Sequence, residues 1–423
     1  MNKTREWGNM QYRICIFYCV CILSATFIRW MNYFNLVFSL FVLVLILMSG
    51  RLCKDRLCLL WAGFIIIYPL GDALLRGETG LSLFTALCYS VPLFFLVMTD
   101  CSIDNCIKPY LTFFKFFALF QAFGVFLNKI WNGLYLKLLW HIVSAPGYAS
   151  DGFSSDRTVA AYILCLGIGC FLFEAEKEEN FTKTKLHKWG CALILFLALV
   201  FTNKRSFLIA PIVAVVFIQI INSLHKPSRF LKIFTISIVS CIAFGMICVM
   251  CYNAGYENAL SRVGATIIGV RNNEDVSSMR STWAELMDSW RQDHKVFGIG
   301  WESFITRLKS TEYAGKVPNG HNVYKQILCE EGYVGIIVYL GLVIYTIAAS
   351  IKLVISKRKE KNPELFCFAK IACYMLLVFA IYCYSGNAIY DAEIYFPFFF
   401  AIKMLQIIHK THPVNQRYLD MYF

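Results

Sequence analysis

Runs of about 20 apolar residues recur along this chain, and they restrict its fold more than any other feature. Because the hydrocarbon core of a bilayer is about 30 Å thick, a run of that length is what an α-helix needs to cross it. Lipid offers the backbone no hydrogen-bond partners, so apolar runs with short polar breaks predict a bundle of helices. With 58% hydrophobic and only 16% charged residues among 423, the sequence predicts an all-α integral membrane protein.

Twelve spans are predicted within one polytopic membrane domain, residues 1–423. They lie near residues 12–28, 34–50, 57–75, 81–98, 110–128, 158–174, 189–202, 206–222, 231–252, 327–350, 365–385 and 389–408. The first run lacks a small-residue cleavage site and is soon followed by another, so we interpret it as a membrane anchor and not as a removed signal peptide. An even number of spans places both ends of the chain on one side of the membrane.

Lys and Arg are concentrated between the spans, which argues against a nucleic-acid partner despite the formal net charge of +13. Basic residues gather in the loops at 51–56, 183–188, 226–232 and 357–361, and all four loops fall on the same side. The positive-inside rule assigns that side to the cytoplasm. Both termini are therefore expected in the cytoplasm.

Many of the eighteen cysteines lie inside apolar runs, where a cysteine acts as a small hydrophobe and not as part of a disulfide framework. These are Cys15, Cys19, Cys21, Cys165, Cys170, Cys241, Cys248 and Cys373. The sequence shows no cysteine and histidine at zinc-ligand spacing and no aspartate-rich motif. We therefore expect neither a metal nor another cofactor.

One long segment, residues 253–325, is the only stretch large enough to fold outside the bilayer. Its apolar residues Trp283, Leu286, Met287 and Trp290 follow the spacing of one helical face. Thr282 and Glu285 fit a capping box at the start of that helix. We expect the helix to lie on the membrane surface. The alternative is a helix packed on the tops of the spans.

The turn between the seventh and eighth predicted spans carries two adjacent cations, Lys204 and Arg205, on the side that normally avoids them. The preceding run, from Trp189 to Thr202, would form a helix of only about 21 Å, so the turn is expected to be recessed in the outer leaflet. A cation at depth is costly and usually faces a polar cavity or an anion, and a lipid diphosphate would be such an anion. Snorkelling of the two side chains is the alternative.

A second group of motifs lies in the long segment. Its members are Arg280-Ser-Thr-Trp283, Gly298-Ile-Gly300, His321-Asn322-Val-Tyr324 and Glu331-Gly332. Gly298 and Gly300 are interpreted as a turn and not as a dinucleotide fingerprint, because Ser303 stands where the third glycine should be. Asp72, Asp391 and Glu393, near outer span ends, are further candidates for site carboxylates, and His294 is interpreted as a surface residue.

The order of these motifs is similar to that of the O-antigen polymerase and O-antigen ligase superfamily, which includes the Wzy-type polysaccharide polymerases. The shared features are a short cationic turn, a long external loop with Arg-x-x-Trp and Gly-x-Gly, and His-Asn-x-Tyr ahead of a Glu-Gly span start. His321 and Gly332 also match the family's His-x10-Gly pattern. The resemblance covers residues 157–350. Arg157 misses the Arg-x10-Gly pattern by one position, and Lys204 stands where many relatives have serine.

The resemblance implies a metal-independent, inverting transfer of a glycan from an undecaprenyl-diphosphate donor to a hydroxyl acceptor, at the outer face of the bacterial plasma (inner) membrane. Arg205 and Arg280 would hold the diphosphate and stabilise the leaving charge. His321 would position or deprotonate the acceptor, since a pKa of about 6.5 suits a general base. The further substrate-binding candidates are Lys204, Asn322, Tyr324 and Arg157.

The expected partners are a lipid-linked glycan donor and acceptor, membrane lipids and a chain-length regulator. A polymerase and a ligase differ in the acceptor, which is another lipid-linked repeat unit in the first and lipid A-core or a protein in the second. We favour the polymerase, because capsule and O-antigen loci carry many divergent chains of this kind. A transporter of lipid-linked oligosaccharide also offers about twelve spans, but transporters usually show repeated halves and interrupted midplane helices.

Overall fold

The computed structural model describes residues 53–72, 93, 96, 101–142, 152–154, 157–178, 180–272, 280–311, 320–359 and 362–411. Every regular element in these ranges is a helix, which confirms the all-helical class. The predicted spans near 12–28 and 34–50, and the one near 81–98 apart from residues 93 and 96, lie outside the described residues.

The helices are α3 (Arg56–Ile65), η1 (Ile66–Asp72), η2 (Ile103–Ile107), α6 (Lys108–Ile130), α7 (Asn132–Ile142), α8 (Arg157–Glu176), α9 (Lys183–Phe201), α10 (Arg205–Ser223), α11 (Pro227–Asn253), α12 (Ala259–Arg271), α13 (Arg280–Arg291), α14 (Ser303–Leu308), α15 (Val323–Glu330), α16 (Gly332–Lys359), α17 (Pro363–Cys383) and α18 (Ala392–Thr411).

Seven helical segments in the described ranges are long and apolar enough to cross a membrane. They contain α6, α8, α9, α10, α11, α16 and α17. The total of twelve spans therefore stays a prediction. Two boundaries are corrected. The predicted span 327–350 is two helices, because Gly332 takes a positive φ of 64° and separates α15 from α16.

The second corrected boundary is the start of α9, which lies at Lys183 and not at Trp189. Thr182 caps the helix by accepting a hydrogen bond from the backbone N–H of Lys185 at 3.1 Å. A helix of 19 residues is about 28 Å long, close to the thickness of the hydrocarbon core. Helix α9 is therefore long enough to span the core, and its length gives no support to a recessed position for the turn that follows it.

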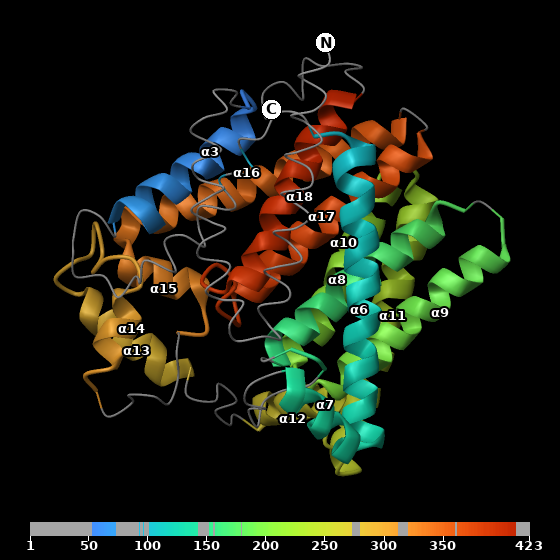
Figure 1. Ribbon diagram of the computed structural model, residues 1–423, viewed down its shortest axis with the longest axis horizontal. Coiled ribbons are helices and arrows are strands. Elements are labelled where there is room, and N and C mark those ends of the chain that lie inside the picture. Colours follow the sequence, from blue (N-terminus) through green and yellow to red (C-terminus); the bar gives the residue numbers. More distant parts are fainter. Residues whose placement is uncertain are drawn as a thin grey trace.

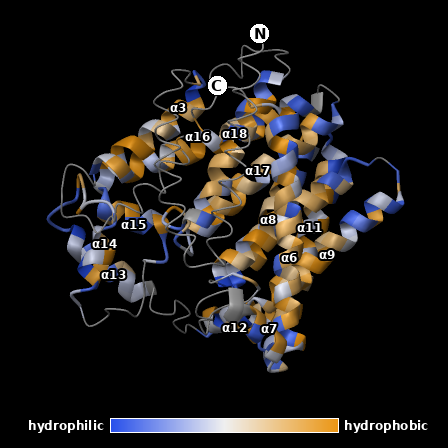
Figure 2. Ribbon diagram, in the orientation of Figure 1, coloured by the Kyte–Doolittle hydropathy of each residue, from blue (hydrophilic) through white to orange (hydrophobic). Residues whose placement is uncertain are grey.

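Helices α8 and α17 form the centre of the bundle (Figure 1), and 89% and 83% of their most apolar stretches are buried. The Tyr374 hydroxyl on α17 donates a hydrogen bond of 2.7 Å to the backbone carbonyl of Cys165 on α8. Gly169 permits this approach, because a side chain there would overlap the Tyr374 ring. Helix α11 is the opposite case. Its mean hydropathy is 2.5 but only 6% of its apolar stretch is buried, as expected for a helix that faces lipid (Figure 2).

Successive helices from α8 to α11 run in alternating directions, so the bundle has two ends (Figure 1). The loop end carries the start of α8, the turn between α9 and α10, and α12. The basic end carries the starts of α9, α11 and α17. Lys183, Lys188, Lys226 and Arg229 belong to the basic end, as their grouping in the sequence predicts. Which side of the membrane each end faces stays a prediction.

The segment 253–325 carries the helices α12, α13 and α14 within its described part. The predicted apolar face of α13 exists, and Trp283 and Met287 are fully buried on it. That face packs against Phe304 and Leu308 of α14 and Cys329 of α15, so its apolar surface is covered by protein and not by the membrane surface. Helix α13 begins at Arg280, which places Thr282 inside the first turn and excludes the predicted capping box.

Candidate functional site

The cationic turn reverses the chain between α9 and α10 at the loop end. Asn203 takes a positive φ of 58°, a conformation that asparagine tolerates better than most residues. Lys204 follows as the N-cap residue of α10, and its Nζ donates a hydrogen bond of 2.6 Å to the Thr158 hydroxyl on α8. Arg205 is the first residue of α10, and its Nη1 donates to the Thr266 hydroxyl on α12 at 2.6 Å.

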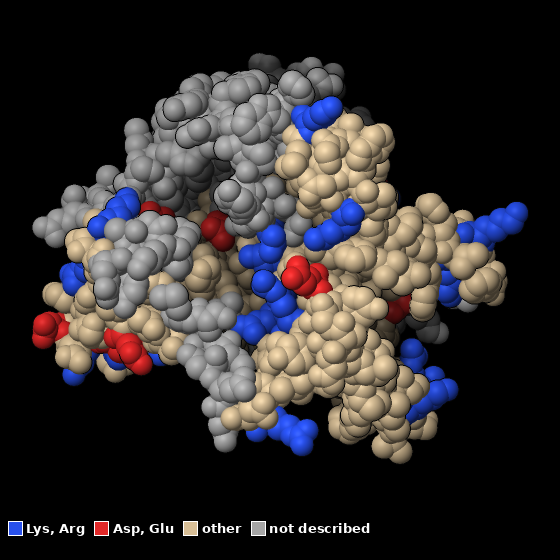
Figure 3. Space-filling view, turned by 90° about the horizontal axis from the view of Figure 1, so that it is seen from below, with Lys and Arg blue, Asp and Glu red and all other residues tan. Residues whose placement is uncertain are grey.

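Two further arginines border this turn. Arg262 on α12 donates from Nη1 to the backbone carbonyl of Asn203 at 3.3 Å. Arg157 is half-buried at the first residue of α8, next to Thr158. Figure 3, a view from below onto the loop end, shows Lys and Arg side chains gathered in the middle of the face, with acidic side chains beside them. Three helices therefore place cations together, an arrangement suited to an anion because each guanidinium can donate to two oxygens.

The Gly-x-Gly motif is a turn, as predicted, and it pairs with the junction of α15 and α16. The backbone N–H of Gly300 donates to the carbonyl of Glu330 at 2.7 Å, and that of Val334 donates to the carbonyl of Val296 at 3.1 Å. Gly298 and Gly332 both have positive φ, and a Cβ at either position would overlap the backbone of the opposite segment. Glycine is therefore required at both positions for the two segments to approach.

Glu330 connects three segments by hydrogen bonds: α14, α15 and the turn before α18. Its Oε1 accepts hydrogen bonds from Gln326 Nε2 at 3.0 Å and from the Phe304 N–H at 3.3 Å. Its Oε2 accepts from the Tyr390 hydroxyl at 2.6 Å. Burial of this fully enclosed side chain raises its pKa to about 7, while the Tyr390 and Gln326 hydrogen bonds oppose the rise. We call Glu330, Gln326, Phe304 and Tyr390 the Glu330 network.

A second buried carboxyl, Glu302, follows Trp301 in the same turn. Its backbone is left-handed with φ 58°, and the residue is 7% exposed. Burial, with a smaller contribution from the negative charge of Glu330, raises the pKa of Glu302 to about 8. Trp301 itself is fixed by its backbone N–H, which donates to Asp72 Oδ2 at 2.6 Å, and by stacking on Tyr390.

His321 adjoins this network and takes a left-handed conformation with φ 54°. Its backbone N–H donates to Asn387 Oδ1 at 2.9 Å, and the N–H of Gly320 donates to Gln326 Oε1 at 3.1 Å. The chain is thus held on both sides of the strained residue. A non-glycine residue kept at positive φ by surrounding hydrogen bonds is a frequent mark of a functional site.

The other predicted site residues differ in what their polar groups contact. Asn322 caps α15, with its Oδ1 accepting from the N–H of Lys325 at 3.1 Å. The Tyr324 hydroxyl donates to the carbonyl of Ala380 on α17 at 2.8 Å, and burial raises its pKa well above the usual value. The backbone of Arg280 begins α13, but its side chain lies outside the described part of the structure.

An aromatic contact ties the cationic turn to the support of His321. Phe207, two residues into α10 after Arg205, stacks on Tyr382 near the end of α17 with ring centroids 4.3 Å apart. The turn that follows α17 carries Asn387, which binds the backbone of His321. Cations and histidine are therefore positioned by connected elements at one end of the bundle.

Several residues that support the site are missing from the predictions made on sequence alone. They are Thr158, Thr266, Arg262, Glu302, Gln326, Glu330, Asn387 and Tyr390. Glu302 had a local signal, because it is a carboxyl that directly follows the Gly-x-Gly-Trp sequence. Asn387 had none, since its partner is 66 residues away.

The side chains in the described ranges do not bring three or more His, Cys, Asp or Glu residues into an arrangement that could hold a metal ion. What the loop end offers chemically is a set of cations for an anion, and an imidazole whose backbone is fixed. Both are what an electrostatically assisted transfer to a hydroxyl requires.

Residues 190–340 match the model of the O-antigen ligase family. The matched segment contains the cationic turn, α12, the Gly-x-Gly turn, the Glu330 network except Tyr390, and His321. The match confirms the similarity to the O-antigen polymerase and ligase superfamily that the sequence motifs indicate. It supports membrane glycan processing of this type, by a transferase that acts on lipid-linked glycans. No curated protein matches the chain.

Proposed function

We propose that this chain is a polysaccharide polymerase, which joins undecaprenyl-diphosphate-linked repeat units of O-antigen, capsule or exopolysaccharide. The family match supports the transfer of a lipid-linked glycan, because one matched segment includes both Arg205 and His321. The reaction is an inverting, metal-independent glycosyl transfer at the outer face of the bacterial inner membrane.

Arg205 and Arg280 hold the donor diphosphate in this proposal, with Lys204 and Arg157 close to the turn. The hydrogen bond from Arg205 Nη1 to Thr266 orients the guanidinium, whose planar set of N–H donors matches phosphate oxygens. Positive charge fixed before the reaction stabilises the diphosphate as negative charge develops on it. Asn322 retains its amide N–H groups for a sugar hydroxyl, since its oxygen caps α15.

His321 acts on the acceptor. As the acceptor oxygen forms its bond to the anomeric carbon, the bond from that carbon to the diphosphate oxygen breaks. The acceptor proton passes to the imidazole, and the bond electrons leave with undecaprenyl diphosphate. The hydrogen bond from the His321 N–H to Asn387 fixes the backbone from which the imidazole projects.

The experiment that tests the proposal is deletion of the gene followed by gel analysis of surface glycan. A single repeat unit on the acceptor is expected for a polymerase. The ligase is the second candidate, because the matching family model is described as O-antigen ligase. A ligase would leave no glycan on the acceptor, with lipid-linked polymer accumulating, and that outcome would contradict the polymerase.

The membrane orientation has its own test. A single cysteine placed at Lys309, in a chain without native cysteines, should react with an impermeant thiol reagent in whole cells. A cysteine at Lys183, at the basic end, should not react. Labelling of the Lys183 position alone would put the candidate site in the cytoplasm and overturn the assignment of both termini to that side.

A further inference from the structure

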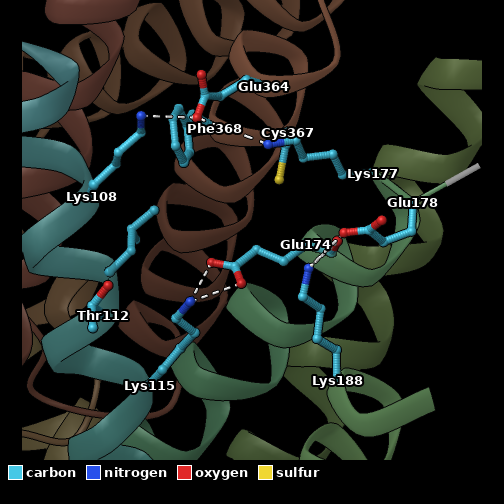
Figure 4. Close-up of a pocket in the computed structure, with 11 residues that line it drawn as sticks. Lys108, Thr112, Lys115, Glu174, Lys177, Glu178, Lys188, Glu364, Cys367 and Phe368 are labelled. Carbon is cyan, nitrogen blue, oxygen red and sulfur yellow. Dashed lines mark hydrogen bonds and ion pairs between the residues drawn. The ribbon is translucent and has the colours of Figure 1, made fainter. Parts of the chain in front are cut away.

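The basic end contains a cavity of about 250 Å³ that is separate from the candidate site (Figure 4). It lies where α6, α8, α9 and α17 meet. Its lining consists of Lys108, Leu111, Thr112, Lys115, Glu174, Lys177, Glu178, Lys188, Glu364, Cys367 and Phe368. Nothing in the proposed transfer uses this cavity, so a ligand here would be independent of that reaction.

Two helices turn one face each toward the cavity. Helix α6 contributes Lys108, Leu111, Thr112 and Lys115, which follow the i, i+3, i+4, i+7 spacing of a single face. Helix α17 contributes residues 364, 367 and 368 with the same kind of spacing. Each face carries both charged and apolar side chains. The cavity is therefore amphipathic, with lysines and glutamates beside an apolar wall.

The lysines and glutamates form a chain of ion pairs around the cavity (Figure 4). Lys115 Nζ contacts the two Glu174 oxygens at 2.6 and 2.8 Å. Lys188 contacts Glu178 at 3.2 Å and the backbone carbonyl of Glu174 at 3.2 Å. An ammonium has three N–H donors, so each lysine can bind a further oxygen without losing its carboxylate.

The pairing is incomplete on the α17 side. Lys108 Nζ contacts Asp104, which lies outside the lining, at 2.7 Å and Glu364 at 3.2 Å. Lys177 lies 3.9 Å from Glu364, beyond hydrogen-bond reach. The lining has four lysines and three glutamates. Asp104 contacts Lys108, and Lys185 contacts the backbone carbonyl of Glu178, so five lysines and four carboxylates surround the cavity, which leaves one positive charge in excess.

We propose that this cavity binds the phosphodiester headgroup of an anionic membrane phospholipid. One phosphodiester carries the single negative charge that the lining lacks, and its oxygens accept hydrogen bonds from the lysines. The apolar wall, Leu111 and Phe368, takes the adjoining glycerol and acyl carbons. Basic pockets between spans are a known kind of site for anionic lipids. The basic end is also the end that the positive-inside rule assigns to the cytoplasmic leaflet.

Native mass spectrometry of the full chain in detergent tests the site. Phosphatidylglycerol is the anionic probe, phosphatidylcholine the zwitterionic one, and inorganic phosphate the free anion. We expect bound phosphatidylglycerol in preference to phosphatidylcholine. In the double variant Lys115→Gln/Lys188→Gln, its affinity should fall about 30-fold.

The matched control is Lys226→Gln/Lys232→Gln, which makes the same charge change at two exposed positions of the basic end. Its affinity for phosphatidylglycerol should stay unchanged. If the first variant does not fold, Lys108→Gln/Lys177→Gln tests the same cavity at its more exposed lysines.

An equal loss of phosphatidylglycerol affinity in the control and cavity variants would overturn the proposal, because the net charge of the protein would then explain the whole effect. Equal binding of the two lipids would overturn it as well. Displacement of the lipid by inorganic phosphate at equal concentration would assign the cavity to free phosphate and reject the lipid.

Discussion

Replacement of Glu302 by glutamine should make the protein more stable at high pH, with little change at low pH. Burial raises the pKa of Glu302 from 4.5 to about 8. Below pH 4.5 the carboxyl is protonated in both the folded and the unfolded chain. Between pH 4.5 and 8 the unfolded chain releases the proton while the folded chain keeps it, so folded-state stability falls as pH rises. Above pH 8 the carboxylate is charged in both states, and the full free-energy cost of burying that charge lowers the stability of the folded chain.

The magnitude follows from the pKa. A rise from 4.5 to about 8 corresponds to roughly 5 kcal/mol of folded-state free energy at high pH. Glutamine has nearly the same shape as glutamate but carries no charge, so the variant should lack the cost.

The assay is thermal unfolding of purified protein in detergent at several values between pH 5 and pH 9. The difference in Tm between Glu302→Gln and the parent should grow with pH. Glu285→Gln is the matched control, since Glu285 is exposed on α13, and its difference from the parent should not change with pH. A Glu302→Gln difference that is independent of pH would refute the idea that Glu302 is buried with a raised pKa.

Three further predictions concern transfer and folding. His321→Asn keeps a residue that tolerates positive φ but removes the imidazole, so turnover should fall about 10²–10⁴-fold. The affinity for the donor and the amount of protein in the membrane should stay unchanged. Full surface polymer in that strain would show that the histidine has no part in the mechanism. Arg205→Lys keeps the positive charge but loses the planar guanidinium, and Thr266→Val removes the hydroxyl that accepts a hydrogen bond from Arg205. Both variants should weaken donor binding in an assay with a lipid diphosphate. Normal binding in Arg205→Lys would rule out a bidentate contact of Arg205 with the diphosphate. Gly332→Ala should reduce the amount of folded protein, measured by size-exclusion chromatography, whereas Gly341→Ala on the same helix, where a Cβ meets nothing, should not.

The sequence by itself determined the class of fold and the segment that matches the family model. Apolar runs of span length specify helices wherever they occur, because the need to satisfy the backbone in lipid is local to each run. The cationic pair Lys204 and Arg205 and the His321 to Gly332 spacing are also local patterns, and both lie in the segment that matches the family model. The Glu331-Gly332 motif was visible in the sequence, but the break that Gly332 makes between α15 and α16 depends on the positive φ and close backbone approach seen only in the structure.

Only the tertiary structure decided which residues support these motifs. Arg205 meets Thr266, and His321 meets Asn387, across 61 and 66 residues of chain. Such pairings depend on how whole helices pack, and no short window of sequence encodes them. The same packing placed the Tyr324 hydroxyl on a backbone carbonyl of α17 and enclosed Glu330. Burial and partner identity are properties of the assembled bundle, so the raised pKa values of Glu302 and Glu330 could not be read from composition or spacing.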